Sequence, residues 1–412
     1  MHFLLLPQGS AGDVNPFLGV ARELLAREHT VEMGTCGYFR DTIERAGVGF
    51  HEIGTTEQYY ELVRNPDLWH PTKATGVVFG HRDAPQAIRD THQLTVNFHQ
   101  RHPDGVVAAG TLAMGARIAL ETHPGLRLAS VHLQPGVLRS IVDPPVLAGV
   151  RFPAWMPRMV VRGFFWLGDR IVDRHVEKSV TAYRRELGLP PQSRYLQHWV
   201  HSPRAILGLF PDWFATAPDW PAWIRLTGFV TEDGVQGLSS ELTEWLAAGE
   251  PPIVYTFGSA MAHGEALFAA ACASSQRLKR RGLMLTQFPE QLPKTLPAGV
   301  RVERYVPLGE LLPRCALLVH HGGIGTTARG LQAGIPQIIV PLSHDQFDNA
   351  ERIRRLGVGD SVPKPKLTGE SLAACIERCL KSPAMPQACR TAAERCRGVN
   401  GAAAACDALE RV

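Results

Sequence analysis

The sequence predicts an α/β fold built from two Rossmann-like, parallel-sheet domains that face each other across a cleft. Three observations lead to this prediction. The chain has 412 residues, which is too many for one ordinary hydrophobic core. Strand-like and helix-like stretches alternate along it, as they do in parallel sheets covered by helices on both faces. A strand, a small-residue turn and a helix open the chain, and the same succession restarts near residue 253.

A stretch rich in proline and tryptophan divides the two halves. We expect a first domain at residues 1–215, a linker at 216–235 and a second domain at 236–390. The last stretch, 391–412, is expected to form a helix, with packing back toward the first domain as one option. Ligands of such sheets bind outside the carboxyl ends of the strands, so a site is expected between the two domains.

Each expected element follows from its local pattern of apolar residues. Between residues 55 and 100, and again between 135 and 202, the pattern loosens, and such insertions often build substrate pockets. Strands are expected at residues 2–7, 29–34, 48–53, 106–110, 126–133, 253–257, 283–287, 300–305, 317–321 and 336–341. Helices are expected from Asn15 onward and at residues 38–46, 114–122, 240–248, 266–281, 326–334 and 347–356.

Composition excludes several classes of protein. The net charge is only +4 and no basic block is interleaved with aromatic residues, so no nucleic acid is expected as a partner. No apolar stretch approaches the roughly 20 residues of a membrane-spanning helix, and no signal-peptide pattern is present. We therefore expect a cytoplasmic protein, with peripheral contact at the inner membrane face left open. The eight cysteines lack zinc-site spacing, so we expect free thiols, no disulfide and no metal.

The first turn, GSAGDVNPF, raises the question of what Asp13 does. Asn15 and Pro16 can start the following helix, with Asn15 as cap and Pro16 at the first helical position. That start leaves Asp13 available as a chemical group at the end of the first strand. The alternative is that the helix begins two residues earlier and that Asp13 serves its N-terminus.

The densest group of functional signals is HHGGIGTT, which follows the apolar run 316–319. Its glycines, Gly322, Gly323 and Gly325, allow a tight turn, and Thr326 with Thr327 opens a short helix. A glycine turn that presents N–H groups and hydroxyls at a helix N-terminus binds anions. The turn is neither a dinucleotide GxGxxG nor a P-loop, because no lysine follows it. A diphosphate is therefore the expected anion.

One strand later, Asp345 and Gln346 follow the run PQIIVP. Adjacent Asp and Gln side chains at a strand end, beside a diphosphate site, can bind the hydroxyl groups of a sugar. The alternative is that Asp345 only caps the helix that starts near Phe347. The neighbouring glycine turn favours the sugar-binding interpretation.

These motifs resemble the nucleotide-sugar signature of the glycosyltransferase family that includes plant and sterol glucosyltransferases and antibiotic glycosyltransferases. The resemblance covers essentially the whole chain, since GSAGDVNPFLGVARELLARE is also similar to the acceptor-domain opening of that family. It implies the GT-B fold and a nucleoside diphosphate sugar, linked to dTDP or UDP, as co-substrate. Stretches such as GSAGDV, YVPLG and HDQFDNAERI are further similar to the rhamnosyltransferases of rhamnolipid synthesis.

The resemblance also implies roles for individual residues. Asp13 falls where family members carry the base that deprotonates the acceptor, histidine in plant members and aspartate in several bacterial ones. His321 falls on the histidine that contacts the donor diphosphate. The other matches are Ser259, Gly323, Gly325, Thr326 and Thr327 for the diphosphate, Asp345 and Gln346 for the donor sugar, and Tyr305 with Val306 for the nucleobase.

Two departures from the family bear on the donor. Arg329 stands where plant members have a glutamate on the ribose hydroxyls, and Tyr305 and Leu308 stand where they have Trp and Gln around the base. Loss of the ribose contact would suit a deoxyribose donor such as a dTDP-sugar, although sterol-type members with UDP donors share this departure. No D-x-D occurs in the chain, so we expect no metal ion and no other cofactor.

The acceptor is expected to be a hydrophobic molecule with a hydroxyl group. An apolar cluster interrupted by arginines has three possible roles. It can form a wall of the acceptor pocket, contact a membrane surface, or pack against the rest of the first domain. The predicted pocket residues are Trp155, Met159, Phe164 and Phe165.

The sequence thus predicts an inverting, metal-independent glycosyltransferase that moves a hexose, rhamnose from dTDP-rhamnose, to a lipid-like acceptor such as a hydroxy fatty acid dimer. The main alternative is a UDP-glucose-dependent sterol, lipid or natural-product glucosyltransferase. Two further alternatives are a sugar-nucleotide 2-epimerase and a non-catalytic auxiliary subunit that binds the donor. The oligomeric state is left open.

Overall fold

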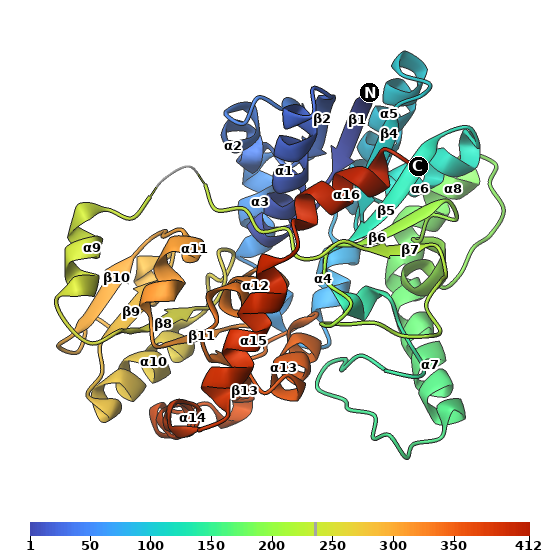
Figure 1. Ribbon diagram of the computed structural model, residues 1–412. Helices are drawn as coiled ribbons and strands as arrows, with labels where there is room; N and C mark the ends of the chain where they lie inside the picture. The colour runs from blue at the N-terminus through green and yellow to red at the C-terminus, as the bar shows by residue number, and fades with distance from the viewer. Residues whose placement is uncertain (235–236) are drawn as a thin grey trace. The chain divides into compact units, whose positions relative to one another are not determined.

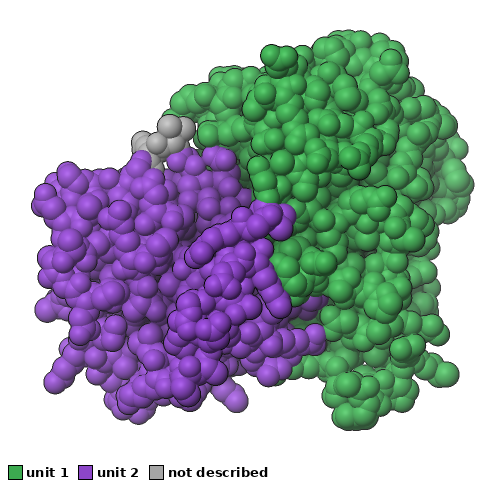
Figure 2. Space-filling model, in the orientation of Figure 1, with its two compact units in different colours: residues 1–230, 400–412 green, residues 231–399 purple. Residues whose placement is uncertain are grey.

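The computed structural model describes residues 1–234 and 237–412. The chain divides into two units, residues 1–230 with 400–412 and residues 231–399 (Figure 2). The expected boundary between linker and second domain, at residues 235 and 236, lies outside the described residues.

Unit 1 contains a parallel sheet of seven described strands in the order β3-β2-β1-β4-β5-β6-β7 (Figure 1). The order reverses between β1 and β4, which pair with Leu4 opposite Val107. The strands are β1 (His2–Leu6), β2 (Thr30–Thr35), β3 (Gly49–Glu52), β4 (Val106–Gly110), β5 (Arg127–His132), β6 (Ala205–Gly208) and β7 (Ile224–Leu226).

Helices cover this sheet, and several of them lie in the insertions that lacked a clear pattern. Helix α5 occupies much of the first insertion and α7 lies in the second. The helices of unit 1 are α1 (Ala11–Ala26), α2 (Arg40–Glu44), α3 (Thr56–Val63), α4 (Ala74–Gly80), α5 (Ala84–Arg101), α6 (Met114–Thr122), α7 (Arg158–Val176), α8 (Ala182–Glu186) and α16 (Gly401–Leu409).

Strand β1 is buried on both faces, as expected for a central parallel strand. Phe3 and Leu5 pack with apolar residues of α1 on one side, whereas Leu4 and Leu6 pack with those of α5 and α6 on the other. Each such side chain contributes about 1.5–3 kcal/mol when it is buried. This burial holds the strand in place and therefore fixes where the following turn, with Asp13, leaves the sheet.

Unit 2 contains a parallel sheet of six described strands in the order β10-β9-β8-β11-β12-β13. Here the order reverses between β8 and β11. The strands are β8 (Ile253–Thr256), β9 (Gly282–Leu285), β10 (Val300–Glu303), β11 (Leu317–His320), β12 (Gln337–Ile339) and β13 (Gly359–Ser361). The helices are α9 (Ser240–Ala247), α10 (Glu265–Leu278), α11 (Leu308–Leu311), α12 (Ile324–Ala333), α13 (Gln346–Arg355), α14 (Gly369–Lys381) and α15 (Met385–Arg397).

The predicted pair of Rossmann-like parallel-sheet domains is confirmed. Strand β7 lies inside 216–235, the stretch predicted as linker, and pairs with β6. The stretch 391–412 is divided between α15 and α16. Helix α16 packs on α1 within unit 1, where Arg27, directly after α1, pairs with Asp407 at 2.7 Å and Glu410 at 3.1 Å.

Candidate functional site

Each sheet has one point where its strand order reverses, and ligands of open parallel sheets bind outside the carboxyl ends of the strands at such points. In unit 2 the turns after β8 and β11 leave the sheet there, and they carry Ser259 and His321. In unit 1 the turn after β1 leaves the sheet there and carries Asp13. The fold therefore puts the main predicted site residues of each unit where its topology favours a ligand.

The two turns of unit 2 meet through the His321 ring. A Cβ atom on Gly258 would lie 3.2 Å from the Nε2 atom of His321, and one on Gly323 would lie 2.6 Å from it. Both glycines are therefore required for the ring to lie between the two turns. Gly258 also has φ +104°, which few other residues adopt. Ser259 is exposed beside it.

Burial makes both neighbouring histidines neutral near pH 7. It lowers the pKa of His321 to about 4, although a hydrogen bond with the backbone of Thr256 opposes the shift. Burial lowers the pKa of His320 to about 3. The N–H of Gly322 donates to His320 Nδ1 at 3.2 Å, so the proton is on Nε2, which donates to Gln337 Oε1 at 3.0 Å. His320 therefore supports the turn from behind, while His321 is the imidazole at its surface.

Helix α12 starts directly after the glycine turn, with Gly323 as its N-cap. The N–H groups of its first three residues have no partner within the helix and form an anion-binding end. Thr326 is partly exposed there, whereas Thr327 is buried and donates its hydroxyl to the Gly323 carbonyl at 3.0 Å. Thr326 is thus placed to reach a ligand, and Thr327 holds the turn in shape.

Asp345 and Gln346 lie at the start of α13, after β12. The side chain of Asp345 does not cap the helix. Instead, its Oδ2 atom accepts a hydrogen bond from the Nδ2 amide of Asn349 at 2.7 Å. The same Asn349 amide donates to the Gly322 carbonyl at 2.8 Å, so it joins the sugar pair to the glycine turn. Gln346 is buried, and its Oε1 accepts from the backbone N–H groups of Leu342 and Ser343. Its amide NH₂ is the part that could donate to a sugar.

The expected nucleobase segment follows β10. Tyr305 is half exposed and its hydroxyl accepts from the Gly234 N–H at 3.1 Å, whereas the side chain of Val306 is buried in the core of unit 2. Val306 could therefore offer a base only its main chain. Arg329, which the sequence comparison with plant members sets at a ribose-binding position, pairs with Asp233 at 2.9 Å.

Helix α1 starts earlier than the sequence suggested, and the expected start at Asn15 and Pro16 is wrong. The helix begins at Ala11 with Ser10 as N-cap. The Ser10 N–H and hydroxyl both donate to Asp13 Oδ2, at 2.7 and 3.0 Å, so Asp13 does serve the helix N-terminus. The stretch SAGD matches the S-x-x-D pattern of a capping box, which was the missed signal.

The capping contact does not exclude a chemical role for Asp13, because its second oxygen is not used in these bonds. Burial raises the pKa of Asp13 above its usual value, and the two bonds from Ser10 oppose the shift. Gly9, with φ +133°, allows the close approach, since a Cβ there would lie 2.3 Å from Asp13 Oδ2. A carboxylate with a raised pKa is a stronger base than a free one.

Sequence reasoning missed two groups of residues in unit 1. Tyr38 and Tyr59 stack with their ring centroids 4.4 Å apart, and burial raises the pKa of Tyr59, with a smaller contribution from the charge of Asp13. At the ends of β4 and β5, Thr111 bonds His132 at 3.0 Å and His132 bonds His201 at 2.9 Å. Burial lowers the pKa of both histidines, that of His201 to about 4. For Thr111 and His132, the available signal was their position at the ends of β4 and β5.

The four residues predicted for the acceptor pocket do not share one surface. Phe165 is buried against Phe152, with ring centroids 5.8 Å apart, and Phe164 is partly buried. Trp155 and Met159 face solvent, 79% and 81% exposed. Their joint assignment to a pocket stays a prediction.

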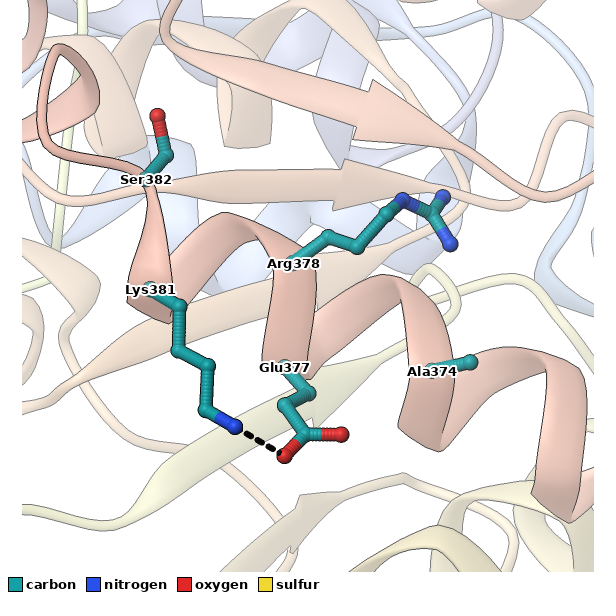
Figure 3. A pocket seen from close by; sticks show the side chains of 5 residues that line it. All are labelled: Ala374, Glu377, Arg378, Lys381 and Ser382. Atoms are coloured by element: carbon teal, nitrogen blue, oxygen red, sulfur yellow. Dashed lines mark hydrogen bonds and ion pairs between the residues drawn. The ribbon is translucent and has the colours of Figure 1, made fainter.

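A shallow hollow lies on α14, and none of the predicted site residues lines it. Within it Lys381 pairs with Glu377 at 2.7 Å, and Arg378 pairs with Asp360 at 3.0 Å. Its exposed charges are thus already paired with neighbours, and we do not consider it a candidate site. Its lining residues are Ala374, Glu377, Arg378, Lys381 and Ser382 (Figure 3).

Three further findings concern cysteines, metals and membranes. All eight cysteines are free thiols. Over residues 1–234 and 237–412, the structure has no cluster of three or more His, Cys, Asp or Glu side chains arranged to hold a metal ion. Within the same ranges, none of the helices has the length and apolar character needed to cross a membrane.

Known protein families match both ends of the chain. Residues 3–124 match the glycosyltransferase family 28 N-terminal domain. Residues 284–402 match the C-terminal domain of erythromycin biosynthesis protein CIII-like proteins.

Individual proteins are similar over the full length. The O-mycaminosyltylonolide 6-deoxyallosyltransferase of Streptomyces fradiae is 29% identical, over 100% of this chain and 97% of its own. A sterol 3-beta-glucosyltransferase of Arabidopsis thaliana is 27% identical, over 100% of this chain and 68% of its own. The solved structure of spinosyn rhamnosyltransferase SpnG complexed with thymidine diphosphate has the same fold, with TM-score 0.71, 18% identity and full coverage of both chains. The finer similarity to rhamnolipid rhamnosyltransferases stays a prediction.

Proposed function

We propose that this chain, a nucleotide-sugar glycosyltransferase with the GT-B fold, transfers rhamnose from dTDP-rhamnose to a hydroxyl group of a lipid-like acceptor, with inversion and without a metal ion. The observation that carries the donor part is the pair of glycine turns after β8 and β11. There the neutral His321 ring lies between Gly258 and Gly323, beside the free N–H groups of α12. This arrangement suits a diphosphate.

A deoxyribose nucleotide with a 6-deoxy sugar is supported by three observations. Arg329 stands where plant members of the resembling family have a glutamate on the ribose, and it pairs with Asp233. One relative is named a 6-deoxyallosyltransferase, and SpnG is a rhamnosyltransferase solved with thymidine diphosphate. SpnG has also been solved with spinosyn aglycone, which is consistent with a hydrophobic acceptor.

In the proposed reaction Asp13 takes the proton of the acceptor hydroxyl. The acceptor oxygen then forms a bond to the anomeric carbon while the bond from that carbon to the diphosphate oxygen breaks. The α12 N–H groups, Thr326 and His321 stabilise the charge that develops on the leaving nucleoside diphosphate. Asp345 and the Gln346 amide hold the hydroxyls of the sugar. The negative charge of Asp13 also favours a transition state with positive charge on the sugar ring.

Metal independence is part of the proposal. Because the leaving group is a multiply charged diphosphate, some group must offset its charge. The sequence contains no D-x-D pair for a metal ion, and the turn at α12 offers N–H groups for the same purpose.

The alternative function is a UDP-glucose-dependent sterol or lipid glucosyltransferase. It is favoured by the similarity to the sterol 3-beta-glucosyltransferase of Arabidopsis thaliana. The two functions differ in nucleotide, sugar and acceptor, so one assay can separate them.

The proposal is tested with the purified chain alone, in EDTA, with dTDP-rhamnose or UDP-glucose and a set of hydroxylated lipids and sterols. We expect mass spectrometry to detect a rhamnosylated hydroxy fatty acid product, with the anomeric configuration opposite to that of the donor by NMR. A glucosylated product from UDP-glucose would establish the alternative. No transfer and no donor hydrolysis without a partner protein would favour an auxiliary subunit, and activity that EDTA abolishes would refute metal independence.

A further inference from the structure

The solvent face of helix α7 and the segment before it concentrate exposed apolar side chains. Seven of the fourteen large hydrophobic residues that are exposed in the described chain lie between residues 150 and 171. Trp155 and Met159 are about four-fifths exposed, and Trp166 is 60% exposed. Single exposed apolar residues are ordinary, but a contiguous group of them marks an interaction surface.

The geometry of α7 explains why this surface is continuous. An α-helix has 3.6 residues per turn, so residues three and four apart share a face. Val161, Phe165 and Val176 lie on the buried face. The opposite face, which is normally polar in a surface helix, is formed by Met159, Val160, Gly163, Trp166, Leu167, Arg170, Ile171 and Arg174.

Helix α7 carries four arginines and two aspartates, and its arginines are exposed. Arg158, Arg162, Arg170 and Arg174 are exposed, and within the described part of the chain none of them pairs with a carboxylate. The guanidinium of Arg170 lies 5.4 Å from the centre of the Trp166 ring.

The acidic residues of α7 do not cancel these charges. Asp169 is buried and pairs with Arg139 at 2.5 Å. Asp173 accepts the backbone N–H groups of Arg194 and Tyr195. Glu177, directly after the helix, is an exposed carboxylate.

We propose that this Trp/Arg face, defined as Trp155, Met159, Val160, Trp166, Leu167 and Ile171 with Arg170 and Arg174, binds the surface of a membrane that contains anionic lipids. Tryptophan prefers the membrane–water interface, and arginine can extend to lipid phosphates while its stem stays on apolar surface. Helix α7 would lie in the plane of the interface at the edge of unit 1 (Figure 1).

Charge is the reason to prefer a membrane over a second copy of the chain. In a symmetric dimer through this face, the arginines of one copy would approach those of the other. Like charges across an interface are unfavourable, whereas anionic lipid headgroups complement them. The proposal does not depend on which sugar or acceptor the enzyme uses.

The test is sedimentation of the full chain with vesicles of phosphatidylcholine alone or mixed equally with phosphatidylglycerol. We expect binding to the mixed vesicles, little binding to phosphatidylcholine, and weaker binding as salt rises. The double variant Arg170→Gln with Arg174→Gln should bind about thirtyfold more weakly, from about fivefold per lost charge. Trp166→Ser with Leu167→Ser should lose at least about tenfold.

Matched controls remove similar groups elsewhere. Trp223→Ser removes a half-exposed tryptophan, and Arg397→Gln with Arg411→Gln removes two exposed arginines; all of these should bind like the wild type. Circular dichroism melting shows whether each variant folds. No binding to mixed vesicles, or binding that the α7 variants leave unchanged, would overturn the proposal. So would a dimer in solution that Trp166→Ser with Leu167→Ser dissociates, since the face would then join two copies.

Discussion

Replacing Asp13 by asparagine separates its two roles, because the structure shows it both serving the N-terminus of α1 and lying where a base is needed. The carboxylate accepts two bonds from Ser10, at 2.7 and 3.0 Å. Asparagine keeps an acceptor oxygen there but has no basicity and no charge. We expect the free energy of unfolding of Asp13→Asn to change by no more than about 1 kcal/mol, the range for a charge at a helix N-terminus.

The effect on catalysis should be much larger. A positioned base is worth about 10²–10⁴ in rate, or about 2.7–5.4 kcal/mol of barrier. We therefore expect kcat of Asp13→Asn to fall by that factor while the Kd for dTDP, whose predicted contacts lie in unit 2, stays near the wild-type value. Stopped product assays and calorimetric titration measure the two quantities.

Ser10→Ala is the matched control for capping. It removes the hydroxyl that donates to Asp13 and should cost about 1 kcal/mol of stability, yet it leaves the carboxylate in place and should keep kcat within about tenfold. Retention of more than about a tenth of kcat in Asp13→Asn would refute the base assignment, because a positioned base is worth at least about 10². Asp13 would then be a capping residue only.

The pH dependence has a definite sign. Burial raises the pKa of Asp13, so the wild-type rate should fall as pH drops through a value above the usual carboxyl range. At pH values between the unfolded and the raised folded pKa of Asp13, the native state binds more protons than the unfolded state. The contribution of Asp13 to the free energy of unfolding therefore falls as pH rises through this range. Both dependences should be absent from the Asp13→Asn protein; an acid limb that persists unchanged in the variant would belong to another group.

Three further predictions concern unit 2. Because burial lowers the pKa of His321 to about 4, the Kd for dTDP should vary little by calorimetry between pH 7 and 8.5, and a tenfold weakening over that range would reveal a charged imidazole instead. Gly323→Ala places a methyl 2.6 Å from His321 Nε2 and should weaken dTDP binding at least tenfold. Gly325→Ala is the control, because its methyl meets no protein atom and its N–H remains, so this variant should retain dTDP binding. Equal losses of dTDP affinity in the two variants would contradict this account of the turn. Asp345→Ala should raise KM for the nucleotide sugar more than tenfold while the Kd for dTDP changes less than about threefold, and an equal loss of dTDP binding would make Asp345 a structural residue.

Much of unit 2 could be predicted from the sequence because its signals are local. A buried run followed by three glycines and two threonines predicts a strand, a turn and a helix wherever it occurs, and α12 lies within two residues of the expected range. The contacts that complete the site could not be predicted in this way. Asn349, which joins Asp345 to the glycine turn, lies on α13 and meets Gly322 only after the two strands pair.

Two local signals in unit 1 predict different starts for helix α1. Asn15 and Pro16 are a plausible helix start, but Ser10 and Asp13 form a better one. The helix continues through Pro16, whose missing N–H affects only the carbonyl of the exposed Gly12. Likewise, the sequence shows that residues 155–171 are apolar and basic, but only the fold shows that Phe165 faces inward and Trp166 outward.

The central claim, that unit 2 binds a nucleoside diphosphate between the turns of β8 and β11, is tested most directly by melting the protein with dTDP, UDP or GDP in the presence of EDTA. A nucleotide at about 100 times its Kd adds about 2.7 kcal/mol of stability, which is a shift of several degrees. We predict that dTDP gives the largest shift, UDP a smaller one and GDP none. No shift with dTDP or UDP, or a shift with GDP alone, would contradict the account.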